Sequence, residues 1–214
     1  MKYTKIIGVL AIGLATILPT QAQLGGLGKK LLGNAGGQQG GADLGKLEDD
    51  LFTKMTPAAD LLAAARKLYN EAFDIKEKEG TEKVKDDSKA AGVNAGFKAM
   101  GSLGKVMNER AKNPEKIKMS PEQQEKFKQA HAKLGEGFAA FVAVSVPVAL
   151  AIKEVTEKDP KALLLHPQLA LLAVACVKDV TTIAGIGVTS AKLAKELKIP
   201  NFNEGNSSFK IPGK

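Results

Sequence analysis

The stretch from Gly137 to Ile152, GFAAFVAVSVPVALAI, decides the fold class of this 214-residue chain. It carries no charge, and Ser145 is its one hydrogen-bonding side chain. Apolar residues surround every face of a helix built from it, so that helix must be buried in protein or lie in lipid. A second apolar stretch, Ala162–Val177, follows the polar turn Thr156–Lys161. The two stretches predict a hydrophobic helical hairpin at the centre of the protein.

The length of each arm bears on whether the hairpin lies in protein or in lipid. Each arm has sixteen residues, which at ~1.5 Å per residue reach about 24 Å, less than the ~30 Å hydrocarbon core of a bilayer. Pro147 removes a backbone hydrogen bond and predicts a kink or break near Ala143–Val146. These features favour a hairpin buried in a water-soluble bundle. Conditional membrane insertion of residues 137–177 is the alternative, and pore-forming bacterial toxins are similar in architecture, without a shared motif.

Apolar residues at helical spacing predict two amphipathic helices that cover the hairpin. A short helix over Asp43–Lys54 comes first, and Thr56-Pro57 has the cap-plus-proline form that would begin a new helix. The next two helices span 60–75 and about 90–112. Their apolar positions are Leu61, Ala65, Leu68, Ala72 and Ile75 in the first helix, where Leu62, Tyr69 and Phe73 widen the stripe, and Val93, Phe97, Met100, Gly104, Met107 and Ala111 in the second.

The clearest local signal is Ser120-Pro121-Glu122-Gln123. Ser120 is suited to the N-cap, Pro121 to the first helical position, and Gln123 can complete a capping box. The helix that follows is amphipathic through five apolar positions, and from Gly137 onward it is apolar on every side. A last helix runs from Pro167 toward Lys198, and Pro200 ends it. The five apolar positions are Phe127, Ala130, Leu134, Phe138 and Phe141.

The first twenty-two residues have the pattern of a bacterial secretory signal. Lys2 and Lys5 precede an apolar run over 6–18, and Thr20-Gln21-Ala22 places small residues before Gln23. An uncleaved membrane anchor is the other interpretation, although the apolar run is short for a span. Residues 23–42 are Gly-rich and predict a flexible segment; their LGGLGKKLLG run also has the leucine and lysine spacing of a membrane-surface peptide. The bundle domain is expected over 43–198, with a C-terminal tail over 199–214.

The charge balance constrains the partners. The formal net charge is +8, and cleavage after Ala22 would remove two lysines and leave +6. Only Arg66 and Arg110 are arginines, whereas bidentate phosphate and base recognition relies on arginine. A lysine-rich surface gives diffuse attraction to anions. The composition therefore argues against nucleic-acid binding and leaves a protein, another envelope component or a membrane surface as the partner.

No residue emerges as a catalytic, cofactor-binding or metal-binding group. His131 and His166 are the two possible general bases near neutral pH, and a nucleophile would need to lie beside one of them. Cys176 lies in an apolar run, which predicts a small buried side chain, and a single cysteine excludes an intramolecular disulfide. Asp86 and Asp87 lack the spacing of a calcium loop. We therefore predict no cofactor and no metal.

Together these observations predict an all-α protein, a bundle of about five or six helices around a hydrophobic hairpin. The signal pattern predicts a periplasmic or secreted location in a bacterium after cleavage near Ala22. The expected function is non-catalytic, through binding or structure in the envelope. Besides membrane insertion, an envelope enzyme with an unrecognised carboxylate site is a further alternative, because such sites leave little trace in one sequence.

Overall fold

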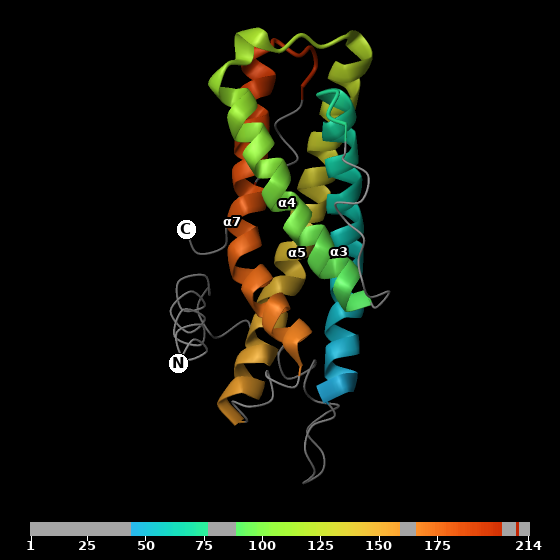
Figure 1. Cartoon of the computed structure of the whole chain (residues 1–214), viewed down its shortest axis with the longest axis vertical. Coiled ribbons are helices and arrows are strands. Elements are labelled where there is room, and N and C mark those ends of the chain that lie inside the picture. Colours follow the sequence, from blue (N-terminus) through green and yellow to red (C-terminus); the bar gives the residue numbers. More distant parts are fainter. Residues whose placement is uncertain (1–43, 77–88, 159–165, 203–208, 210–214) are drawn as a thin grey trace.

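The computed structural model describes residues 44–76, 89–158, 166–202 and 209, and within them the chain is helical with no strand (Figure 1). The all-α prediction is therefore confirmed. The expected signal segment, the Gly-rich segment and the pair Asp86 and Asp87 lie outside the described residues. The helices are α3 (Leu44–Ala72), α4 (Lys89–Lys112), the short 3-10 helix η1 (Pro114–Lys116), α5 (Pro121–Lys158) and α7 (Pro167–Glu196).

The four α-helices pack as a ring in which each contacts two neighbours: α3 packs against α4 and α5, and α7 packs against the same two helices. Hydrogen bonds between Glu48 and His166 and between Asn94 and Gln168 join the N-terminal parts of α3, α4 and α7. These three helices therefore run in the same direction, and α5 runs opposite to them (Figure 1).

The prediction of separate helices before and after Pro57 is wrong, because α3 is one helix of 29 residues with Pro57 inside it. Thr56 does not cap a new helix; its hydroxyl donates to the Phe52 carbonyl at 2.9 Å. Buried side chains flank the proline on both sides, including Met55 and Ala58. Burial of one continuous apolar face offsets the single backbone hydrogen bond that proline removes. This fusion is one reason why the described part has four α-helices rather than five or six.

The helix α5 also continues through a proline, since it runs from Pro121 to Lys158. The break predicted near Ala143–Val146 is therefore wrong. The helix includes the first three residues of the predicted turn Thr156–Lys161. At Gly137, a Cβ would lie 3.0 Å from the Leu62 side chain. The absence of a side chain at Gly137 thus allows α3 and α5 to approach closely.

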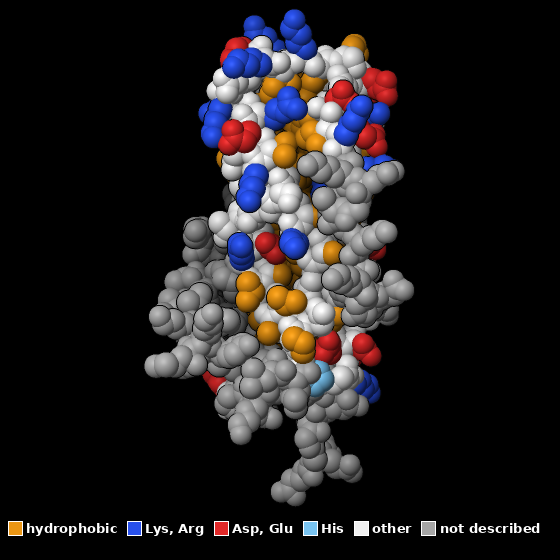
Figure 2. All heavy atoms as spheres, in the orientation of Figure 1, with side chains coloured by type: hydrophobic (Ala, Val, Ile, Leu, Met, Phe, Trp, Pro, Cys, Tyr) orange, Lys and Arg blue, Asp and Glu red, His pale blue; other side chains and the backbone are white. Residues whose placement is uncertain are grey.

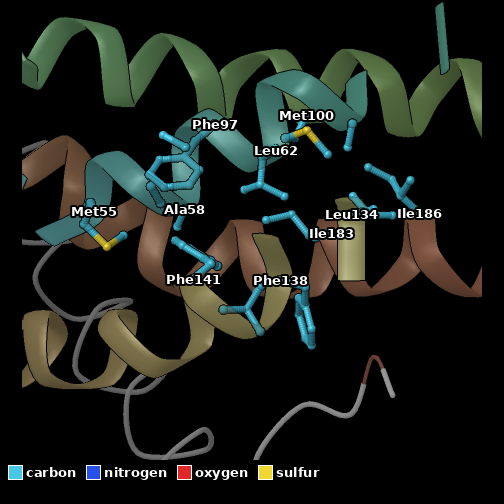
Figure 3. Packing of buried hydrophobic residues seen from close by; sticks show 14 of the residues in the cluster. Met55, Ala58, Leu62, Phe97, Met100, Leu134, Phe138, Phe141, Ile183 and Ile186 are labelled. Carbon is cyan, nitrogen blue, oxygen red and sulfur yellow. The ribbon is translucent and has the colours of Figure 1, made fainter. Parts of the chain in front are cut away.

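A single hydrophobic core runs through the bundle, and side chains from all four helices meet in it (Figure 3). All five predicted core positions of α5, from Phe127 to Phe141, are buried. In α3 the buried stripe includes Ala65 and Ala72 of the predicted positions, together with Leu62, Tyr69 and Phe73, which were predicted to widen it. Leu62 and Tyr69 are fully buried, whereas Leu61 and Leu68 are half-buried. The wider apolar face of α3 allowed either register, and packing against α5 selected one.

Local signals at the helix ends are confirmed where they were strongest. The Ser120 backbone N–H donates to Gln123 Oε1 at 2.9 Å, and the Gln123 N–H donates to Ser120 Oγ at 3.2 Å, which is the predicted capping box. At the C-terminal ends of α3 and α7, Asp74 and Lys198 adopt left-handed conformations with φ of 52°. Each is followed by a Schellman pattern of backbone bonds, for example Ile199 N–H to the Ala194 carbonyl.

Candidate functional site

Three helices bring together a buried polar cluster made of Tyr69 from α3, His131 from α5 and Ser190 from α7. The Tyr69 hydroxyl donates to Ser190 Oγ at 2.7 Å. Ser190 Oγ lies 3.1 Å from His131 Nδ1, so the serine proton can be donated to that nitrogen. Tyr69 and Ser190 are fully buried and His131 is 3% exposed. Each residue occupies the inward face of its helix, so the cluster lies within the core.

Aromatic rings surround this cluster. The Phe127 ring meets Tyr69 edge to face, with 5.4 Å between centroids. From the C-terminal tail, Phe202 lies 4.7 Å and Phe209 5.4 Å from the His131 ring, centroid to centroid. The rings withdraw the polar atoms from water, and burial raises the pKa of the Tyr69 phenol, an effect that its bond to Ser190 opposes in part.

A serine beside a histidine is the pairing that nucleophilic catalysis requires, and the sequence had not singled out Ser190. Here the serine is fully buried and its oxygen accepts a bond from Tyr69. In this arrangement the cluster ties three helices together. Each such hydrogen bond contributes about 1 kcal/mol net, and an unpaired buried partner would cost about 1–3 kcal/mol.

One sequence feature could have identified Ser190. The buried positions of α7 recur at Ile183, Ile186, Ser190 and Leu193, a helical spacing in which serine is the one polar member. A polar residue on an apolar stripe requires a buried partner. The helical period could flag Ser190 in this way, but its partners Tyr69 and His131 are 121 and 59 residues away in the chain.

The second histidine, His166, lies at the N-cap position of α7. Its side chain does not cap the helix. Instead, Nδ1 lies 2.7 Å from Glu48 Oε2 on α3, with both side chains half-buried. Two residues further on, Gln168 Oε1 accepts a hydrogen bond from the Asn94 amide at 2.8 Å. Together these contacts attach the start of α7 to α3 and α4.

The single cysteine behaves as predicted for a small core side chain. Cys176 is 3% exposed, and burial, together with the nearby Asp179, raises the pKa of its thiol. A thiol that remains protonated is a poor nucleophile. Asp179 is half-buried, and desolvation raises the pKa of its carboxyl to about 6 despite the adjacent Lys178. In the described part of the chain, no group of three or more His, Cys, Asp and Glu residues could hold a metal ion.

Among the described helices, α7 is long and apolar enough to cross a membrane, and about half of its most apolar stretch is buried in the fold. Core helices of water-soluble bundles share this property. The arm 162–177 is not wholly interior, because Leu171 and Val174 are exposed.

Comparison of the chain with protein-family models, with curated proteins and with solved structures finds no match. The function must therefore be inferred from the residues and their arrangement.

Proposed function

We propose that this chain is an exported bacterial helical-bundle protein that acts without catalysis, by binding or structure in the cell envelope. The observation that carries the proposal is the burial of the reactive groups. Tyr69, His131, Ser190 and Cys176, the candidates for nucleophile or base in the described core, are 0–3% exposed. What the helices offer to solvent is instead charged, small and apolar side chains, which suit contact with a surface.

Export is the first part to test. The full chain would be produced in a Gram-negative host, and the periplasmic, membrane and cytosolic fractions analysed by intact mass and N-terminal sequencing. We expect a periplasmic species that begins at Gln23. Because the processing enzyme needs a small residue before the cut, Ala22→Leu should accumulate as the uncleaved precursor. A wild-type chain that keeps Met1 and stays in the cytosol would refute the export proposal.

The non-catalytic part is tested by the reactivity of Ser190. A fluorophosphonate probe labels activated serines, and the native protein should not react with it. Urea-unfolded protein and Ser190→Ala are the controls for unspecific labelling. Stoichiometric labelling of native protein that is lost in Ser190→Ala would show an accessible nucleophile and would favour the enzyme alternative.

Conditional membrane insertion through residues 137–177 is the second candidate, and the length and apolarity of α7 favour it. At ~1.5 Å per residue, the 30 residues of α7 reach about 45 Å. This length exceeds the ~30 Å hydrocarbon core of a bilayer, which an arm of sixteen residues is too short to span. Insertion requires α5 and α7 to leave the core. Release of an encapsulated dye from anionic vesicles in mild acid would support it, and retention of the dye at every pH would count against it.

A further inference from the structure

One face of α7 stays open to solvent along most of the helix. Its exposed positions are Leu171, Val174, Lys178, Thr181, Gly185, Val188 and Lys192, which recur every three or four residues. Leu171, Val174 and Val188 are 54%, 41% and 64% exposed, and they are the exposed large hydrophobic residues of the described chain. They lie within seventeen residues of one another, about 26 Å along the helix axis.

The positive charge of the four described α-helices is carried by α4 and α7. The helices α4 and α7 together hold eight basic and three acidic residues, a net charge of +5. The helices α3 and α5 hold nine basic and ten acidic residues, a net charge of −1. On α4, Lys98 and Lys105 are exposed seven residues apart and form no ion pair within the described residues.

The space-filling view shows both features on one face. Hydrophobic side chains reach the surface in its lower half, over the N-terminal part of α7, and lysine and arginine side chains spread above them over α4 (Figure 2). Lysine stems can lie along an apolar surface while the ammonium groups reach phosphate oxygens. An apolar strip bordered by lysines is the pattern of helices that lie in the interface of an anionic bilayer.

We propose that the face formed by α4 and α7, here called the α4–α7 face, docks on an anionic lipid bilayer. The bundle stays folded, α7 lies parallel to the membrane, and Leu171, Val174 and Val188 enter the headgroup region. This inference rests on the proposed export, which would bring the chain to the envelope membranes. It names the partner of that function as a lipid surface.

Charge and composition distinguish this partner from the others. A second copy of the chain would bring together two helix pairs, each of net charge +5, which opposes a symmetric dimer through this face. A nucleic acid would use the lysines but would leave the three exposed apolar side chains without a role. A bilayer with anionic lipids uses both, since the apolar side chains gain burial and each lysine gains attraction to the surface.

Cosedimentation with vesicles tests the proposal, using protein purified in the form that the host yields. We expect binding to vesicles of phosphatidylglycerol and phosphatidylcholine in equal amounts, at least about tenfold stronger than to phosphatidylcholine alone. The double variant K98Q/K105Q should bind the anionic vesicles with an affinity at least about tenfold lower than that of the wild type. The matched pair K54Q/K67Q, which removes two exposed lysines from α3, should change binding less than about twofold.

The apolar contribution is tested separately with L171S/V174S/V188S, which should also weaken binding about tenfold or more. Its control is A63S/A64S/A139S, with three exposed alanines of α3 and α5 replaced by serine. Far-UV circular dichroism and urea midpoints would establish that each variant is folded. Every variant keeps the same N-terminus, so differences between variants report the α4–α7 face whether or not residues 1–22 are removed.

Absence of binding to anionic vesicles by folded wild-type protein would overturn the proposal, as would equal effects of the two lysine pairs. A second contrary result has two parts: K98Q/K105Q loses binding while L171S/V174S/V188S keeps it, and the wild type binds a single-stranded oligonucleotide as tightly as the anionic vesicles. This result would show general attraction to polyanions and would also overturn the proposal. Each of these results leaves the proposed function standing if the periplasmic chain begins at Gln23. A cytosolic, uncleaved chain would refute the proposed function independently of the vesicle data.

Discussion

The Phe209 ring lies against Gly187 of α7, in the space that a Cβ at that position would occupy. The ring also packs against Phe138 of α5, with centroids 5.4 Å apart. Phe209 thus occupies a notch that exists because residue 187 has no side chain. The Phe209 ring also lies 5.4 Å from the His131 ring, centroid to centroid, so Phe209 forms part of the enclosure of the buried polar cluster.

Replacing Gly187 by alanine should therefore have opposite effects in two backgrounds. In the wild-type chain the new methyl group displaces Phe209, and we expect a loss of about 1 kcal/mol in the free energy of unfolding. In a Phe209→Ala background the clash is absent, and the higher helix propensity of alanine should stabilise the protein by up to about 1 kcal/mol. Urea denaturation of the four proteins measures both effects. If Gly187→Ala changed the free energy of unfolding in the same direction in both backgrounds, the result would contradict the observed contact.

The Tyr69–Ser190–His131 cluster predicts unequal effects of removing its members. Tyr69→Phe deletes one donor and leaves Ser190 bonded to His131, so we expect a loss of about 1 kcal/mol. Ser190→Ala deletes the partner of both other residues and should cost about 2–3 kcal/mol. The double variant should lose less than the sum of the two, because Tyr69→Phe also removes the hydroxyl that Ser190→Ala leaves unpaired. Additive losses in urea denaturation would argue against a shared network.

Asp179 predicts a pH dependence of stability. Its pKa of about 6 in the folded state exceeds the ordinary value of an unfolded aspartate, so the folded state binds more protons between these two values. The free energy of unfolding should then be highest near pH 4, fall as the pH rises to about 6, and level off above it. Since Asp179 is partly exposed, the contribution should be about 1–2 kcal/mol.

Asp179→Asn should remove this slope and should be more stable than the wild type above pH 6. Lys178→Gln should steepen the slope, because the ammonium group lowers the carboxyl pKa. Chemical denaturation between pH 4 and pH 8 provides the measurement. A wild-type slope that persists in Asp179→Asn would assign the pH dependence to another group.

The contact between Glu48 and His166 should affect the start of α7 rather than the whole fold. In Glu48→Gln we expect faster hydrogen exchange for the backbone amides of 170–173, by about threefold to fivefold, since an isolated, partly exposed contact contributes about 1 kcal/mol or less. Asp49→Asn, at the exposed neighbouring position, is the matched control and should leave exchange unchanged. A uniform increase along all four helices would mean that the contact supports global stability instead.

The local features of the fold could be predicted from the sequence because they depend on interactions within one or two helical turns. The capping box at Ser120 and Gln123 and the buried stripe from Phe127 to Phe141 are examples. The start of α7 at Pro167 is a third. In each case the residues that decide the outcome are neighbours in the chain.

The continuity of α3 through Pro57 could not be predicted in the same way. The local cap-plus-proline signal at Thr56 favours a new helix, and burial of Met55 and Ala58 in one core overrides it. The candidate site depended even more on long-range contacts. The sequence identified His131 as a possible base, but nothing near it in the chain indicated Ser190 or Tyr69.

The sequence by itself determined that the chain forms helices, where most of them begin and end, and which side of each is apolar. Backbone hydrogen bonds, caps and side-chain periodicity act over a few residues, so they can be read directly from the order of amino acids. Only the tertiary structure decided that Ser190 meets His131 and Tyr69, that Phe209 fills the notch at Gly187, and that Leu171, Val174 and Val188 remain exposed. Those outcomes depend on how whole helices rotate and cross, which is set by the combined packing of side chains far apart in the chain.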